Sequence, residues 1–373
     1  MKQSSAKTFA KQTDTDTNSS KILLQLRSSS RVNEVDLDHP GFGDLFSDHM
    51  FSLQYADGEW QDARIIPFED LKVSPAMSTL HYGQTVFEGM KAFRGKDGEI
   101  RFFRMDRHLD RLNTSCERMC IPQVDTGLLK RALKKLVSID KEWVPEKHGN
   151  ALYIRPLAFA TDACLGVRPA EHYRLLIMTS PVGAYYKEGF DPVSLTTSDD
   201  YIRGAKGGTG FIKTACNYGP TLLPAQKAKQ KGFTQIIWLD AKEHKYIEEV
   251  GTMNIFFKID GELHTPPLNG SILGGITRDS VIKLAEHWNI PVHERPITID
   301  EIFEADKNKT LEEVFGTGTA AVISPVGSIH HQGNTLVTDE NEIGPFAKKL
   351  FDTITGIQYS THEDIYHWMS TIS

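Results

Sequence analysis

The spacing of apolar residues predicts a mixture of strands and helices in the first half of the chain. Runs of apolar residues predict strands over 50–55, 63–67, 99–103, 151–157 and 174–178. Apolar positions recur every three or four residues over 109–119 and 128–137, which predicts two amphipathic helices. Asp106 lies where the N-cap of the first of these helices is expected.

The second half continues this mixture without a regular alternation of strand and helix. Strands are predicted over 235–239, 254–259 and 314–316. Helices are predicted over 221–230, 278–288 and 343–351. No repeat of about 20–50 residues is visible. The expected class is therefore α+β, in two domains.

Changes in composition along the chain suggest where the domains begin and end. Residues 1–30 are rich in Ser, Thr, Lys, Asp and Gln and contain no apolar signal-peptide core, so they are expected to form a poorly ordered leader. The Gly-, Tyr- and Lys-containing stretch 184–192 is expected to link a small N-terminal α/β domain, 31–183, to a large C-terminal domain, 193–373.

Composition and charge exclude several classes of protein. The chain has 373 residues and a net charge of −7, without the basic clusters of a nucleic-acid-binding protein. It contains no apolar run of about 18 residues, so no membrane span is expected. Four cysteines without a CxxC pair favour a reduced, cytoplasmic protein over a disulfide scaffold. Cys116 and Cys120, four residues apart, are expected to be buried thiols and not metal ligands.

The stretch Gly204–Thr214 resembles a phosphate-binding P-loop but departs from it at one position. Ile212 stands where that loop needs glycine, so we reject the nucleotide-binding interpretation. Lys213 remains notable because its neighbours are apolar or small. Such a lysine either extends its amine to solvent or supplies a desolvated amine for Schiff-base chemistry, and this motif alone favours the former.

Three further motifs have both a structural and a functional interpretation. Gly274–Asp279 precedes a predicted helix and is either an ordinary junction or an anion site. Gly316–Ala321 is either a tight turn or a place where backbone approaches a ligand. Of Glu248 and Glu249, a buried member needs a cationic partner. Together with Lys213 these motifs suit pyridoxal phosphate, which has a phosphate, a carbonyl and a basic ring nitrogen.

These motifs, taken in order, resemble the branched-chain amino-acid aminotransferases of pyridoxal-phosphate fold type IV. The resemblance runs from about Gly41 to Gly356. It rests on the segments His81–Gly83, Phe87–Gly89, Tyr153–Pro156, Lys213 with Asn217-Tyr218, Glu249–Asn254, Gly275–Arg278 and Gly318–Ala320. It implies a two-domain, D-amino-acid aminotransferase-like fold with the cofactor in the cleft between the domains, and a homodimer.

The resemblance also implies which residues bind the cofactor. Lys213 would hold pyridoxal 5'-phosphate as a Schiff base and then move the substrate proton. Glu249 would pair with the pyridine nitrogen and Tyr218 with the phenolate oxygen. The residues that would bind the phosphate are Arg111, Ile276, Thr277 and Thr319.

For the substrate, the resemblance implies an apolar pocket that also accepts glutamate. Its aromatic walls would be Phe87, Tyr153 and Tyr185, with Tyr82 from a partner subunit. Arg155 would bind the γ-carboxylate of glutamate, and the Thr319-Ala320 turn would bind the α-carboxylate. The implied reaction transfers an amino group from leucine, isoleucine or valine to 2-oxoglutarate.

Related activities remain as alternatives. An aminodeoxychorismate-type lyase would share Lys213 and Glu249 but has no evident need for Arg155. A D-amino-acid aminotransferase should lack the Glu249–Asn254 match. Cys216 and Gly274 depart from the residues common in the branched-chain family, and both lie near the expected cofactor.

Overall fold

The chain forms two compact units. A computed structural model describes residues 11–13, 21–183, 190–339 and 341–373. Contacts between Cα atoms group Met1–Gly183 with Asp364–Ser373 in a first unit and place Ala184–Glu363 in a second. The predicted C-terminal domain extended to Ser373, whereas the last residues group with the first unit. Most of the expected linker, including Tyr185, lies outside the described residues.

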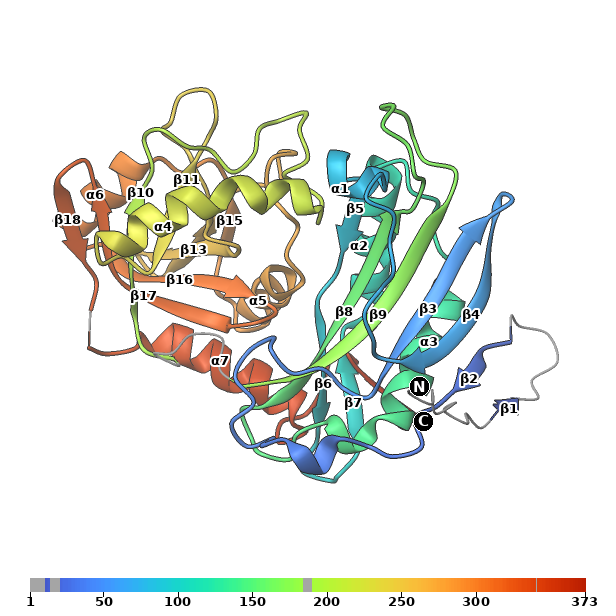
Figure 1. Cartoon of the computed structure of the whole chain (residues 1–373). Coiled ribbons are helices and arrows are strands. Elements are labelled where there is room, and N and C mark those ends of the chain that lie inside the picture. The colour runs from blue at the N-terminus through green and yellow to red at the C-terminus, as the bar shows by residue number, and fades with distance from the viewer. Residues whose placement is uncertain (1–10, 14–20, 184–189, 340) are drawn as a thin grey trace. The chain divides into compact units, whose positions relative to one another are not determined.

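The first unit is built on a ten-stranded, mostly antiparallel sheet (Figure 1). The strand order is β1-β2-β4-β3-β9-β8-β6-β7-β19, and β5 pairs with β8. The bounds of these strands are β1 Lys11–Thr13, β2 Leu23–Gln25, β3 His49–Ala56, β4 Glu59–Pro67, β5 Thr85–Phe87, β6 Met90–Arg94, β7 Ile100–Phe103, β8 Ala151–Ala160, β9 Tyr173–Val182 and β19 Met369–Thr371.

Helices α2 (Met105–Arg118) and α3 (Thr126–Ile139) bury their apolar stripes against one face of this sheet. The short helix α1 (Ser78–Tyr82) precedes β5. Asp125 caps α3 by accepting the first free amide protons of that helix, as such residues commonly do. The prediction that Asp106 caps α2 is wrong. Arg104 occupies the N-cap in a left-handed conformation, and Asp106 lies in the first helical turn.

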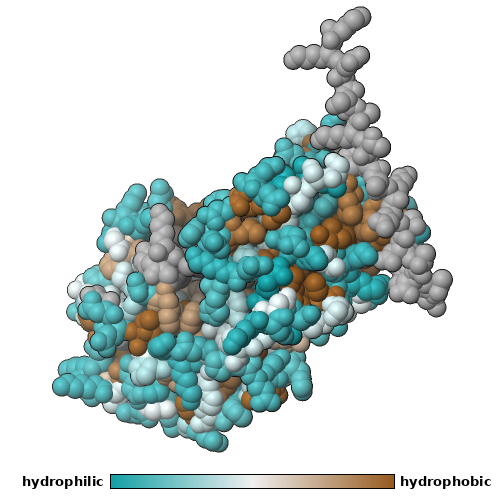
Figure 2. All heavy atoms as spheres, turned by 90° about the horizontal axis from the view of Figure 1, so that it is seen from below, coloured by the Kyte–Doolittle hydropathy of each residue, from teal (hydrophilic) through white to brown (hydrophobic). Residues whose placement is uncertain are grey.

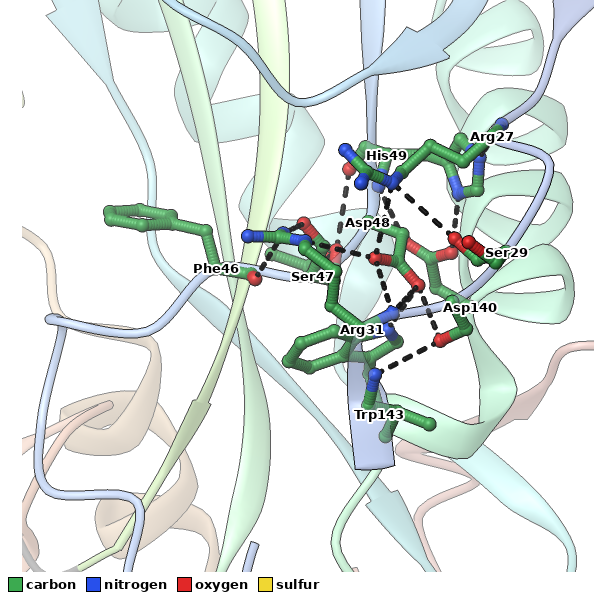
Figure 3. A network of polar contacts seen from close by, with 12 residues as sticks. Arg27, Ser29, Arg31, Phe46, Ser47, Asp48, His49, Asp140 and Trp143 are labelled. Atoms are coloured by element: carbon green, nitrogen blue, oxygen red, sulfur yellow. Dashed lines mark hydrogen bonds and ion pairs between the residues drawn. The ribbon is translucent and has the colours of Figure 1, made fainter. Parts of the chain in front are cut away.

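Residues 21–30, expected to be part of a poorly ordered leader, are tied into the first unit. Strand β2 pairs with β4, and the following residues reach a buried polar network (Figure 3). The Arg27 backbone amide donates to His49 Nε2, which leaves His49 Nδ1 to donate to Asp140 at 2.6 Å. Buried Asp48 accepts from the Arg31 guanidinium and the Trp143 indole. The network therefore fixes the path of the chain into β3.

The second unit is built on a nine-stranded mixed sheet with the order β12-β11-β10-β17-β16-β13-β14-β15, and β18 pairs with β17. Its strands are β10 Val193–Thr197, β11 Gln235–Leu239, β12 Ile247–Val250, β13 Asn254–Ile259, β14 Glu262–Thr265, β15 Val292–Glu294, β16 Leu311–Gly318, β17 Val322–His331 and β18 Asn334–Val337. Its helices are α4 Leu222–Gln230, α5 Ile276–His287, α6 Ile299–Lys307 and α7 Pro345–Gln358. Helix α4 contacts β11, and α7 contacts β17.

Most of the strands and helices predicted for both halves are present, with ends that differ by a few residues. Among the helices of the described residues, none has the length and apolar character that a membrane span needs. One face of the molecule shows separate apolar groups among hydrophilic side chains (Figure 2).

Candidate active site

Lys213 lies in a loop of the second unit that Asn217 holds in shape. The Asn217 side-chain amide donates to the backbone carbonyls of Thr209 and Ile212 at 2.8 and 2.9 Å, and its oxygen accepts from the Thr209 hydroxyl at 2.6 Å. Lys213 is half-buried, and its Nζ donates to the Tyr218 hydroxyl at 2.9 Å. The two residues predicted to act on the same cofactor are thus in contact.

We expect Asn217→Ala to lower stability by about 2 kcal/mol, because it removes three hydrogen bonds and leaves buried polar groups unsatisfied. The midpoint of urea denaturation measures this loss. Thr221→Ala, which removes a single hydroxyl bond to the Tyr218 carbonyl, is the matched control and should cost about 1 kcal/mol. Equal losses would show that Asn217 does not organise the loop.

Glu249, on β12, is a buried carboxylate with a cationic partner. It is 2% exposed, and the Arg203 guanidinium forms an ion pair with its Oε2. Among the described residues, no group donates a well-oriented hydrogen bond to that oxygen. The Asn254 amide donates to Oε1 at 3.4 Å. Burial, opposed by Arg203, raises the pKa of Glu249 to about 7. A protonated ring nitrogen beside this carboxylate would supply the hydrogen bond that Oε2 lacks among the described residues.

Helix α5 begins where the sequence predicted an anion site. Gly275 is its N-cap, and a side chain there would collide with Asn254 Oδ1 at 2.0 Å. Ile276 and Thr277 form the first turn and are both buried. Since the first amides of a helix have no partner within the helix, this end suits a phosphate.

The Gly316–Ala321 motif is partly explained by internal packing. A side chain at Gly316 or Gly318 would approach Met253 within 2.9 or 3.1 Å, so these glycines accommodate Met253. Thr319 and Ala320 form the turn between β16 and β17. The turn ends at Val322, whose φ of 63° is unfavourable for a β-branched residue. Such strain often accompanies binding turns.

In the first unit, Arg111 is paired with the buried Glu88, a residue of the Phe87–Gly89 motif to which the sequence assigned no role. Its Nε and Nη2 donate to the two carboxylate oxygens of Glu88 at 2.6 and 2.9 Å. His108 contacts the same carboxylate at 3.0 Å. Burial opposes ionisation of Glu88, but Arg111 and His108 hold the pKa of this carboxyl far below its usual range. Glu88 therefore orients Arg111 and uses two of its five N–H groups.

Phe87, Tyr153 and Arg155, predicted to share a substrate pocket, lie together in the first unit. The Arg155 guanidinium lies over the Phe87 ring at 4.7 Å and donates to the Tyr153 hydroxyl at 3.2 Å. A side chain at Gly89 would collide with that hydroxyl, at 1.8 Å. Lys91, on β6, lies directly opposite Tyr153, on β8. Burial lowers the pKa of Lys91 to about 8.

Tyr82, the fourth residue predicted for the substrate pocket, contacts a different part of the first unit. It ends α1, is 41% exposed, and its hydroxyl donates to the Leu165 backbone carbonyl. Tyr185 lies outside the described residues. Sequence analysis missed Arg203, Asn254, Glu88 and Lys91. Asn254 and Glu88 lay inside quoted motifs but were given no role, whereas Arg203 and Lys91 had no local signal beyond a charged residue near a motif.

The second unit's donors match the chemistry of pyridoxal phosphate. The Lys213 amine contacts the Tyr218 phenol. In the described part of the chain, the buried Oε2 of Glu249 has no hydrogen-bond partner. The nearby Thr317 hydroxyl is also buried without a hydrogen-bond partner among the described residues. Together with the start of α5, these groups could meet a carbonyl, a phenolate, a ring nitrogen and a phosphate.

Comparison with known proteins agrees with this donor set. The family described as Amino-transferase class IV matches residues 85–329. Branched-chain-amino-acid aminotransferase 2 of Bacillus subtilis is 52% identical over 353 residues, covering 94% of this chain and 97% of that protein. This chain belongs to the branched-chain amino-acid aminotransferases of class IV. The Mycobacterium tuberculosis branched-chain-amino-acid aminotransferase is 44% identical and covers 91% of this chain and 94% of its own.

Solved structures of branched-chain aminotransferases have the same fold. The Escherichia coli branched-chain amino acid aminotransferase superposes with a TM-score of 0.74 at 29% identity, over 87% of this chain and 99% of that one. Another branched-chain amino acid aminotransferase, solved with pyridoxamine 5'-phosphate, gives a TM-score of 0.70 at 27% identity, over 86% and 98%. The predicted family, the α+β, fold-type-IV class and the pyridoxal-phosphate cofactor are therefore confirmed.

Proposed function

We propose that this chain catalyses the reversible transfer of an amino group between a branched-chain L-amino acid and 2-oxoglutarate, with pyridoxal 5'-phosphate as cofactor. The cofactor supplies an electron sink for the carbanion that forms when the α-proton leaves. Relatives at 52% and 48% identity carry the branched-chain names, and both cover nearly the whole chain.

Each proposed cofactor contact uses a group whose geometry suits it. Lys213 binds the cofactor and carries the proton to and from the substrate α-carbon, since its amine is half-buried beside Tyr218. The Tyr218 hydroxyl binds the phenolate oxygen. Glu249, buried and oriented by Arg203, holds a proton on the ring nitrogen.

The phosphate is proposed to bind donors of three kinds. The first turn of α5 offers the Ile276 and Thr277 amides and the Thr277 hydroxyl. The Arg111 guanidinium, oriented by Glu88, adds N–H donors that suit phosphate oxygens. Thr319 contributes from its turn, where the neighbouring Ala320 amide is proposed to receive the substrate α-carboxylate.

The observation that carries the substrate proposal is the position of Arg155 against two aromatic rings. Phe87 and Tyr153 supply an apolar wall for a branched side chain, while the guanidinium supplies a partner for the glutamate γ-carboxylate. Tyr185 is proposed as a further wall of this pocket, although it lies outside the described residues. One surface therefore suits both substrates. Because one methylene changes the binding free energy by only about 1–3 kcal/mol, such a pocket should discriminate weakly among leucine, isoleucine and valine.

Incubation of the purified holoenzyme with L-leucine and 2-oxoglutarate tests the proposal, with glutamate as the measured product. We expect glutamate formation with L-leucine and none with D-alanine. No glutamate from L-leucine at saturating cofactor would exclude the proposed function. Glutamate from D-alanine alone would indicate a D-amino-acid aminotransferase.

We expect Arg155→Ala to reduce kcat/KM for 2-oxoglutarate by about 100-fold, because a charge-assisted pair worth about 3 kcal/mol is lost. The same variant should change kcat/KM for L-leucine less than tenfold, and half-reactions followed by absorbance separate the two values. Arg174→Ala, on the neighbouring β9, is the control. Equal losses for both substrates would show that Arg155 does not bind the γ-carboxylate.

We also propose a cytoplasmic homodimer in which Tyr82 reaches the partner's substrate pocket. The support is an exposed apolar group around Tyr82, formed by Leu80, Leu165 and Val167 at 60%, 65% and 83% exposure. The free cysteines support a reducing compartment. Light scattering with Val167→Asp tests the dimer, which this charge should weaken.

A further inference from the structure

The second unit contains a cavity that the proposed reaction does not use. Its volume is about 550 Å³, within the usual range for small-molecule sites. It lies between the β11–β12 hairpin, the loop that precedes α5 and the segment just before the Lys213 loop. Side chains of both charges line it together with apolar ones.

Glu248 is a buried carboxylate in the wall of this cavity. It is 6% exposed, and its Oε1 accepts a hydrogen bond from the Ser271 hydroxyl. No hydrogen bond or ion pair of its Oε2 occurs among the described residues, although the charge of Arg203 acts on this carboxylate. Glu248 lies at a bulge of β12, because Trp238 of β11 pairs with Glu249 and the next residue of β11, Leu239, pairs with Ile247. A carboxylate this buried needs a cation or a strong donor.

A metal ion does not suit this position. The other carboxylate of the cavity, Asp240, already accepts hydrogen bonds from four backbone amides of the hairpin at 2.8–3.1 Å. Only Glu248 therefore presents an open carboxylate oxygen there, and no cluster of His, Cys, Asp and Glu suited to a metal occurs among the described residues. The chemistry calls for an organic ammonium group.

The exposed part of the cavity lining has the opposite charge. Lys206 and Lys242 are exposed, and Lys206 forms no ion pair in the part of the chain that is described. The remaining walls include the apolar side chains of Pro267, Ile272 and Pro296. A ligand that satisfies all three regions carries an ammonium, a carboxylate and an apolar side chain.

We propose that this cavity binds a free apolar α-amino acid, with its ammonium group on Glu248 and its carboxylate on Lys206. The site goes beyond the proposed function, because it is separate from Lys213 and performs no chemistry. Residues next to the cavity also pack against the Lys213 loop and against Asn254, which contacts Glu249. The Ser271 carbonyl packs where a Gly210 side chain would stand, and the Leu273 carbonyl accepts from Asn254 at 2.8 Å.

The test uses holoenzyme reduced with borohydride, which fixes the cofactor on its lysine and blocks amino-acid exchange at the primary site. Calorimetry with L-leucine should then still detect one binding site per chain. Lys206→Glu should weaken this binding at least tenfold, because a charge-assisted contact becomes repulsive. Lys229→Glu, an equal charge change on exposed α4, should leave it unchanged.

Two ligand analogues and a second variant complete the test. 4-Methylpentanoate lacks the ammonium group and 3-methylbutylamine lacks the carboxylate, so each should bind at least tenfold more weakly than L-leucine. Glu248→Gln keeps a partner for Ser271 and should also weaken L-leucine at least tenfold. If this variant does not fold, Lys206→Glu decides.

Absence of L-leucine binding to the reduced enzyme, or unchanged affinity in the Lys206 variant, would overturn the proposal. Glutamate formation by the unreduced enzyme is measured separately. A failure of this site is therefore distinguishable from a failure of the proposed function.

Discussion

Replacing Lys213 with alanine is expected to abolish both the visible absorption band of the bound cofactor and transamination. The lysine is proposed to bind the cofactor and to carry the substrate proton, so one substitution removes an anchor and an acid–base group. We expect turnover to fall on the order of 10⁴-fold or more. Absorbance spectra and single-turnover measurements with L-leucine test both parts.

Two further variants make the Lys213 result specific. Lys213→Arg keeps a positive charge beside Tyr218 but cannot bind the cofactor covalently, so it should be as inactive as the alanine variant. Lys229→Ala, on exposed α4, should behave like the parent enzyme. A band of native intensity in Lys213→Ala would assign the cofactor to another lysine, and buried Lys91 would be the first to test.

Glu249→Gln is expected to impair both catalysis and stability. Glutamine has nearly the same shape but cannot balance a protonated ring nitrogen, so turnover should fall by about 100-fold or more. It also leaves the Arg203 side chain, 5% exposed, without its anion. Breaking a buried ion pair in this way costs about 3–5 kcal/mol, which denaturation of the cofactor-free protein measures.

A double-mutant cycle separates these two effects. Arg203→Gln combined with Glu249→Gln removes both charges and should recover part of the stability lost in Glu249→Gln, but none of the turnover. Glu301→Gln breaks the more exposed Arg295–Glu301 pair and should cost no more than about 1 kcal/mol. Recovery of turnover in the double variant would contradict a direct role for Glu249 at the cofactor.

The pH dependence of stability offers an independent check on Glu249. Its pKa in the folded protein is about 7, against an ordinary value of 4.5, mainly because of burial. Between these pH values the folded state holds a proton that the unfolded state releases. The stability from this group is thus fully present below about 4.5 and is lost as the pH rises through about 7. Glu249→Gln should remove this component in the cofactor-free protein.

The sequence predicted the parts of the site that are local in the chain. Lys213 and Tyr218 are five residues apart in one loop, so a single sequence motif contains both. The hydrogen bond between them is seen only in the folded structure. Arg203 and Glu249 come from separate segments, and only packing brings them together. The same holds for Glu88 on Arg111, which the apolar spacing of α2 could not reveal.

Errors in the predicted fold have similar causes. Asp106 has the right residue type for an N-cap, but Arg104, in a left-handed conformation, is the N-cap two residues earlier. Strands such as β2 and β19 have three residues each, too few for a periodic signal. They exist because neighbouring strands supply their hydrogen bonds, which is information from distant parts of the sequence.

The return of the chain to the first unit at β19 has a consequence for synthesis on the ribosome. Strand β19 pairs with β7, yet the whole second unit is translated between them. During translation β7 therefore exposes an open edge until the last residues emerge. A nascent chain stalled within the second unit would carry this edge unprotected, and chaperones that bind unpaired strands would find it there.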